Sequence, residues 1–265
     1  MKNIATNLNP IAGKRILITR PKGYGTNLSD LLRKRHALPI EVPMIEIDSL
    51  KNFELLDNRL SNIKSYDWLI LGSIHVVEAI TNRLNRLSID FKCLEEIKIA
   101  TVGSATTKSL NICGIKSDFL TTYKGSESIV KSFKYQNITG QRILIPSSDI
   151  GGHNLEKGLS FKGNIVERID AYRNLIPKSA PRELTNAFQK GIDIIILTSA
   201  STATNLYSIL GKDTKKLAGV AIVCLGQVTA SAAQKLGLVV NLVAKEHNME
   251  SLVEVLESNY CGVNK

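Results

Sequence analysis

A long internal repeat limits what this chain of 265 residues can fold into more than any other feature. Four blocks recur in the same order: Lys14 to Thr19 as Gln141 to Pro146, Asp67 to Ser73 as Asp193 to Ser199, Ala100 to Gly114 as Ile222 to Gly237, and Ser128 to Phe133 as Ser251 to Leu256. The offsets between matching residues stay within 123 to 127. Because a period this long indicates a duplicated domain rather than a solenoid, we expect two similar halves.

Within each half, short apolar runs alternate with segments of helical spacing. The runs that predict strands are Arg15 to Arg20, Trp68 to Leu71, Ile97 to Val102, Ile143 to Ile145, Ile194 to Leu197 and Val220 to Leu225. Apolar residues follow Ser73 at the spacing of a helix face, namely Val76, Val77, Ile80, Leu84 and Leu87. Strands that alternate with helices predict an α/β fold whose parallel sheets are covered on both faces.

Prolines mark two segments that fit this alternation less well. Leu38 to Ile47 contains Pro39 and Pro43, which favours an edge strand or a crossing linker over a central strand. Pro177 and Pro181 are expected to bracket a second linker.

The charge and cysteine content exclude several classes of protein. The net charge of +10 comes from scattered Lys and Arg without a basic run or interleaved aromatics. We therefore expect a solvated basic surface, with the attraction of a polyanionic small molecule as the alternative, and no nucleic-acid partner. The cysteines Cys93, Cys113, Cys224 and Cys261 show no metal-binding or redox spacing and are expected to be structural. Neither a signal peptide nor an apolar run of membrane-spanning length is visible, which predicts a cytoplasmic monomer with no membrane partner.

Hydroxyl side chains recur where predicted strands lead into helices. They are Ser73, Thr106, Thr198, Ser199 and Thr229. Each is compatible with a role as an ordinary helix cap. Because helix N-termini attract anions at the edge where parallel sheets bind ligands, matching junctions in both halves also predict a cleft suited to several carboxylates. The four histidines have no ligand spacing, so no metal site is expected.

Several of these blocks together resemble the uroporphyrinogen-III synthase family over about residues 13 to 258. The likeness lies in the restart at Gln141, the segment ending Ala171-Tyr172, the run Asp193 to Ser199, and Leu225-Gly-Gln-Val-Thr-Ala230 followed by Gly237. The resemblance implies two flavodoxin-like lobes joined by two extended linkers, near residues 42–50 and 170–180. Lobe one would be residues 1–48 with 174–265, and lobe two residues 50–172.

The resemblance also implies a reaction. The family converts hydroxymethylbilane, a linear tetrapyrrole with eight carboxylates, to uroporphyrinogen III by inverting the last pyrrole ring and closing the macrocycle with loss of water, without a cofactor. This sequence matches the family's site positions at Ser73, Thr106, Tyr172, Thr198, Ser199, Val228 and Thr229. Tyr172, at the end of the extended segment from Ile165, is the residue expected to act as catalytic acid.

The sequence departs from the family pattern at four places. Leu71-Gly-Ser73 replaces the usual Phe-Thr-Ser, His75 stands where asparagine is common, and Val228 takes a frequent threonine position. Pro146 to Gly152 lacks a frequent arginine. These differences place the individual site residues in doubt more than the family.

Two other functions remain open on the sequence alone. A bilobal ligand-binding protein without catalytic activity would show the same repeat, and turnover of hydroxymethylbilane would distinguish it. A nucleotide enzyme would need a complete phosphate loop, but Gly23 and Gly25 begin a fingerprint whose third glycine position holds Leu28.

Overall fold

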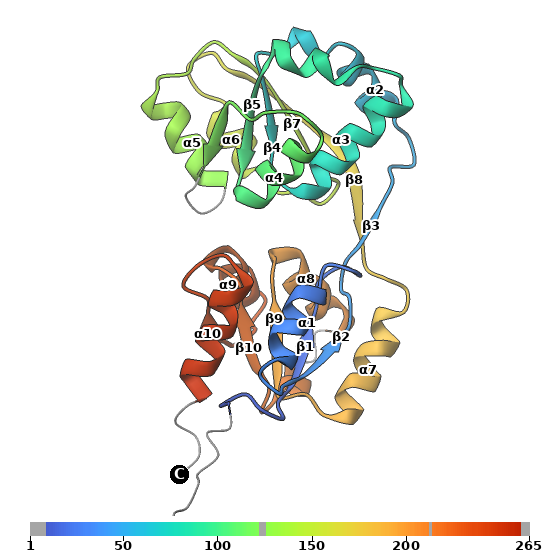
Figure 1. The fold of residues 1–265 in the computed structure, drawn as a ribbon, viewed down its shortest axis with the longest axis vertical. Helices are drawn as coiled ribbons and strands as arrows, with labels where there is room; N and C mark the ends of the chain where they lie inside the picture. The colour runs from blue at the N-terminus through green and yellow to red at the C-terminus, as the bar shows by residue number, and fades with distance from the viewer. Residues whose placement is uncertain (1–8, 122–125, 212–213, 261–265) are drawn as a thin grey trace, which may run out of the picture. The chain divides into compact units, whose positions relative to one another are not determined.

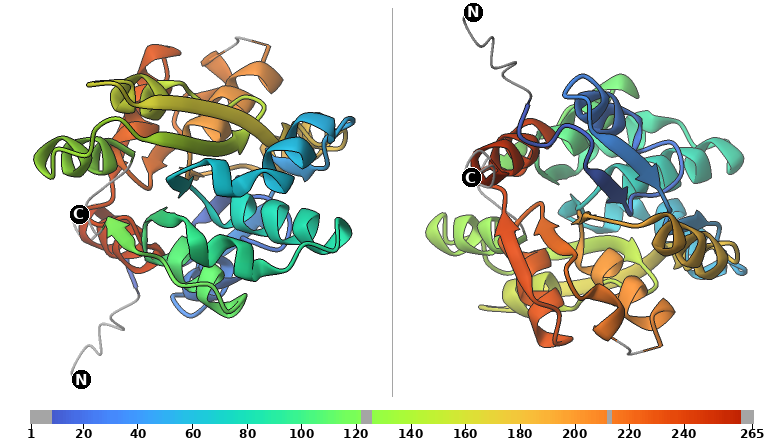
Figure 2. Two further views of the ribbon diagram at one scale, coloured as in Figure 1. Left: turned by 90° about the horizontal axis from the view of Figure 1, so that it is seen from above. Right: turned by 90° about the horizontal axis from the view of Figure 1, so that it is seen from below.

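The computed structural model describes residues 9–121, 126–211 and 214–260, and the chain divides into two compact units (Figure 1). Unit one combines Met1–Glu46 with Leu175–Lys265, and unit two is Ile47–Asn174. Each unit contains its own sheet with helices on both faces, as the two views in Figure 2 also show. The expected α/β fold with two parallel sheets is confirmed.

Unit one contains a five-stranded parallel sheet in the order β11-β10-β9-β1-β2. Its strands are β1 (Arg15–Ile18), β2 (Leu38–Glu41), β9 (Ile194–Leu197), β10 (Ala221–Cys224) and β11 (Val240–Val243). Its helices are α1 (Thr26–Arg33), α7 (Ala180–Lys190), α8 (Ala200–Ile209), α9 (Gln227–Lys235) and α10 (Met249–Tyr260), with a short 3-10 turn at Thr214–Leu217.

The continuous apolar run of β1 follows from burial on both faces of this sheet. Ile16 and Ile18 pack with α1 and α10, and Leu17 between them packs with α7, α8 and α9 on the other face. Because successive strand side chains point to opposite faces, only an unbroken apolar sequence suits such a central strand.

Unit two contains a six-stranded sheet in the order β3-β8-β7-β4-β5-β6. Its strands are β3 (Glu46–Asp48), β4 (Trp68–Leu71), β5 (Lys98–Val102), β6 (Phe119–Thr121), β7 (Arg142–Ser148) and β8 (Ile165–Leu175). Its helices are α2 (Glu54–Ser61), α3 (Ile74–Arg86), α4 (Ser104–Ile112), α5 (Ser126–Tyr135) and α6 (Asn154–Leu159), with 3-10 turns at Ile63–Ser65 and Phe91–Glu96. The core on one face lies under α2, α3 and α4, and the core on the other lies under α5 and α6.

The sequence repeat corresponds to equivalent strands. The positions in the two sheets match strand by strand. In unit two, β7 and β8 correspond to β1 and β2 of unit one, and β4, β5 and β6 correspond to β9, β10 and β11. The repeated aspartates make the same contact, because Asp193 Oδ2 accepts a hydrogen bond from Arg15 N and Asp67 Oδ2 accepts one from Arg142 N, both at 2.8 Å. The duplication therefore extends to individual hydrogen bonds.

Two expectations about prolines have different outcomes. The segment from Leu38 forms β2 at the sheet edge, as Pro39 predicts, because a residue without an N–H is tolerated there. The prediction that a linker extends from Pro177 to Pro181 is wrong at its second boundary, because α7 begins at Ala180. Pro181 lies in the first turn of α7, where its missing N–H has no helical partner to lose.

The structural role expected for the cysteines is supported most clearly by Cys224. Its side chain is fully buried in β10, and burial raises the pKa of its thiol to about 12. Cys93 and Cys113 are half-buried beside the α3 core. Cys261 lies outside the described residues.

Candidate functional site

The carboxyl edge of each sheet is the candidate site. In open parallel sheets, ligands bind at the carboxyl ends of the strands, at the point where the strand order reverses. From the two strands at this point, the chain connections lead toward opposite edges of the sheet. This point lies between β1 and β9 in unit one and between the equivalent β7 and β4 in unit two.

Ser73 and Ser199 occupy equivalent positions at these edges and cap the helices that follow. Ser73 accepts a hydrogen bond from Val76 N at 3.3 Å at the start of α3. Ser199 accepts one from Thr202 N at 3.2 Å at the start of α8, and Ser199 N donates in turn to the Thr202 hydroxyl at 3.2 Å. Thr198, just before it, is half-buried. The capping interpretation is therefore correct for both serines.

Thr106 and Thr229 are also equivalent, but neither is a cap. The N-caps of α4 and α9 are Gly103 and Gly226, and each threonine is the third residue of its helix with only 4% and 3% of its surface exposed. Their hydroxyls therefore lie in the packed layer instead of at the open edge. Val228, by contrast, is 71% exposed in the first turn of α9.

Tyr172 lies near the end of β8, beside Ser148 of β7 in the sheet register. The side chain is half-buried against the core under α3, and its ring meets the His75 ring edge-on at 5.9 Å between centroids. Burial raises the pKa of the Tyr172 phenol, and hydrogen bonds with the Ser73 and Ser148 side chains oppose this rise without cancelling it. The phenol therefore stays protonated across the neutral range and can donate a proton.

The loop after β7 is tied to this tyrosine. Asp149 N donates to Tyr172 O at 3.0 Å, and Asp149 Oδ1 accepts from Asn174 N at 2.9 Å. Arg168 donates to Ser148 O, and a side chain at Gly151 would collide with Ser147. The glycine in this loop is therefore required by close packing, and the loop holds Ser148 against the phenol.

The structure brings together only part of the predicted site. In unit two, Ser73 and Tyr172 are in contact, joined by Ser148 and His75. Sequence reasoning noted Ser148 and His75 only as departures from a family pattern. Since Ser148 is 24 residues from Tyr172 and His75 is 97 residues away, no local pattern would have paired them.

The helices that follow the central strands share a feature of charge. α3, α4, α8 and α9 have no acidic residue in their first turns. Acidic residues do occupy the first turns of α2, α5, α6, α7 and α10. Helix α1 has none either, but the Glu41 carboxylate lies against its N-cap, Gly25. Since an acidic side chain neutralises the partial positive charge of a helix N-terminus, four N-termini remain available to anions, two in each unit.

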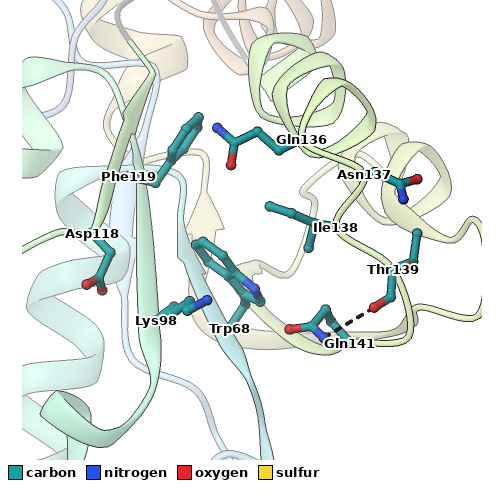
Figure 3. A pocket seen from close by; sticks show the side chains of 9 residues that line it. All are labelled: Trp68, Lys98, Asp118, Phe119, Gln136, Asn137, Ile138, Thr139 and Gln141. Carbon is teal, nitrogen blue, oxygen red and sulfur yellow. Dashed lines mark hydrogen bonds between the residues drawn. The ribbon is translucent and has the colours of Figure 1, made fainter.

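A pocket of about 460 Å³ lies at the opposite, amino edge of the unit two sheet (Figure 3). Trp68 and Lys98 begin β4 and β5, and Gln141 directly precedes β7. Figure 3 shows the Trp68 ring at the centre of this pocket with Phe119 and Ile138 near it. None of the predicted site residues lines it, so it is separate from the carboxyl-edge residues.

Within the described residues, no group of three or more His, Cys, Asp or Glu side chains is arranged to hold a metal ion. Among the helices in the same part of the chain, none is long and apolar enough to cross a membrane.

Comparisons with known proteins identify the family. The family model for uroporphyrinogen-III synthase HemD matches residues 26–254. The uroporphyrinogen-III synthase of Synechococcus elongatus is 33% identical over 94% of this chain and 96% of its own length. The chain belongs to the uroporphyrinogen-III synthase family.

Solved structures of uroporphyrinogen-III synthases share the fold. A mutant of the Thermus thermophilus enzyme covers 93% of this chain and 98% of its own, with a TM-score of 0.68 and 16% identity. The Helicobacter pylori protein covers 93% and 99%, with a TM-score of 0.56 and 17% identity. At these identities the likeness shows the family fold alone, and the roles of individual residues come from the geometry described above.

Proposed function

We propose that this protein is a uroporphyrinogen-III synthase, a hydro-lyase that converts hydroxymethylbilane to uroporphyrinogen III with inversion of ring D. Family membership supports the reaction. The observation that carries it to this site is the set of four helix N-termini at the carboxyl edges, those of α3, α4, α8 and α9, which have no acidic residue in their first turns. A substrate with eight carboxylates needs such donors, which bind anions through backbone N–H groups.

The hydrogen-bond donors for these carboxylates can be named residue by residue. The first residues of a helix have N–H groups without helical partners, so the exposed first turn of α9 at Val228 offers backbone donors even though valine has no polar side chain. Ser73, Thr198 and Ser199 add hydroxyls at the same edges. A substitution of the family's threonine by Val228 is therefore compatible with binding.

We propose Tyr172 as the proton donor. When the hydroxyl of the hydroxymethyl group leaves, it takes the phenolic proton and departs as water, and the substrate's pyrrole nitrogen stabilises the cation that remains. The substituted carbon of ring D then attacks, and the resulting spiro intermediate opens and recloses with ring D inverted. A ring proton is lost at the end and can restore the phenol, so water is the only product besides uroporphyrinogen III.

The main contribution that we propose for the protein is to position the two ends of the bilane. Ionisation of a hydroxymethylpyrrole needs no electron transfer, so we propose that no cofactor or metal takes part. Holding the ends of the bilane in the correct geometry favours attack at the substituted carbon of ring D over the free one. We also propose that the protein acts as a cytoplasmic monomer, which fractionation and analytical ultracentrifugation would test.

The test is the isomer ratio of the product. Purified protein, dialysed against a chelator, is mixed with hydroxymethylbilane, and the oxidised products are separated. We expect the type III isomer at a rate proportional to protein concentration. Type I product alone, at the rate without protein, would instead favour a ligand-binding protein without catalytic activity.

A further inference from the structure

Among the partly buried arginines that the structure describes, Arg20 is the one that forms no ion pair with a carboxylate. It follows Thr19 at the carboxyl end of β1. The Thr19 hydroxyl donates to Ile196 O of β9 at 2.7 Å. Arg20 therefore sits at the point of unit one where ligands bind in folds of this kind.

The guanidinium of Arg20 is partly buried, and among the described residues its hydrogen bonds are incomplete. Its Nε is sealed from solvent and has no hydrogen-bond partner among the described residues. Its Nη1 donates to the weak acceptor Met249 Sδ, at 3.5 Å. A guanidinium stays charged in proteins, and burying an unpaired charge costs free energy.

All the other partly buried arginines in the described residues have a carboxylate. Arg15 pairs with Asp193, Arg35 with Glu257, Arg59 with Glu167, Arg83 with Asp57, Arg168 with Asp170, and Arg173 with Asp48. The pairing is therefore the rule in this protein, and Arg20 is its exception.

Two acidic residues at the carboxyl edge of the unit one sheet make hydrogen bonds of their own. Glu41, at the end of β2, accepts a hydrogen bond from the Ser29 hydroxyl of α1. Glu246, three residues before Met249, accepts one from Asn248 Nδ2 at 3.0 Å. Among the described residues, no carboxylate forms an ion pair with Arg20, so its charge is available to an anion from outside the protein.

We propose that Arg20 is a carboxylate-binding residue, and that its anion is a carboxylate of the tetrapyrrole substrate, an inference that rests on the function proposed above. The planar guanidinium binds a carboxylate through two parallel hydrogen bonds. Such a contact would give the guanidinium the anionic partner that it lacks and would fix one acidic side chain of the bilane at the edge of β1.

The experiment compares binding with stability. Arg20→Met keeps the length of the side chain and removes the charge, and Arg182→Met removes one charge from an exposed position on α7 of the same unit. The KM for hydroxymethylbilane and the Kd for uroporphyrin III, which has the same eight carboxylates, are measured together with the thermal midpoint. For Arg20→Met we expect both constants to rise by roughly tenfold or more, with an unchanged or raised midpoint because an unpaired charge is gone. Arg182→Met should change neither.

The outcomes separate this inference from the proposed function. A lowered midpoint with unchanged KM and Kd would show a structural arginine and overturn the inference. Arg20→Lys keeps the charge but not the two parallel bonds, so its KM and Kd should lie between those of wild type and Arg20→Met. The lysine variant replaces the methionine variant if that protein does not fold. If wild type makes no type III product, the proposed function fails, while an Arg20-dependent Kd for uroporphyrin III would still support a carboxylate site.

Discussion

Tyr172 shows how the chemistry of one side chain depends on residues that are distant in sequence. Its position on an extended segment was readable from the sequence, because Ile165 to Tyr172 has the composition of a strand. Its partners were not, since Ser73, His75 and Ser148 reach it only through the sheet register and the start of α3. The raised pKa of the phenol follows from that assembly and from burial.

Tyr172→Phe removes the proposed proton donor while keeping the ring. We expect the rate of type III formation to fall by roughly 10²-fold, at the low end for loss of a general acid, because the substrate ionises readily. Spontaneous type I product should accumulate in its place. The isomer-resolved initial rate is the measurement.

The matched control is Tyr207→Phe, a half-buried tyrosine of α8 in the core of unit one. Its rate should equal that of wild type. A Tyr172→Phe protein that is folded and makes type III product at the wild-type rate would reduce Tyr172 to a packing residue.

At the scale of elements, the sequence predicted strands better than helices. The apolar runs at β1, β4, β7 and β9 are continuous because both faces of each strand are buried, and a pattern of that kind is visible without a structure. Helix α7 was missed because Pro181 suggested a linker, although a first-turn proline is compatible with a helix. Thr106 and Thr229 look like caps in sequence, yet glycines hold the cap positions and packing buries both hydroxyls.

The repeated aspartate before β4 and β9 gives a prediction at this scale. Asp193 accepts from Arg15 N at 2.8 Å and from Arg15 Nε at 3.1 Å. These hydrogen bonds from Arg15, together with its charge, lower the pKa of Asp193 despite the opposing effect of burial. We expect Asp193→Ala to lower the free energy of unfolding at pH 7 by about 1.5–3 kcal/mol, measured by chemical denaturation.

The dependence on pH has a defined sign. Because the folded-state pKa lies below the unfolded value of about 3.9, the stabilisation is fully present above that value and is lost as the pH falls through the folded pKa. The difference between wild type and Asp193→Ala should therefore narrow below about pH 4. Asp30→Ala, which breaks an exposed ion pair on α1, should change stability by less than about 0.5 kcal/mol. Equal effects of the two substitutions would show that the Asp193 contacts do not stabilise the sheet.

At the scale of the whole molecule, the duplication explains why a polyanionic substrate suits this protein. Each unit has its own pair of cores, and at its carboxyl edge two helices, α3 and α4 or α8 and α9, begin without an acidic residue in the first turn. Two copies in one chain double the number of donors, and the basic surface adds to the attraction of anions.

The most direct test of this account is to map where the tetrapyrrole binds. Backbone amide shifts of the isotopically labelled protein are recorded with and without uroporphyrin III. We predict that the largest changes occur at the carboxyl edges of both units, at the starts of α3 and α4 and of α8 and α9. Changes confined to the amino-edge pocket around Trp68, Lys98 and Gln141, or to one unit alone, would contradict the account.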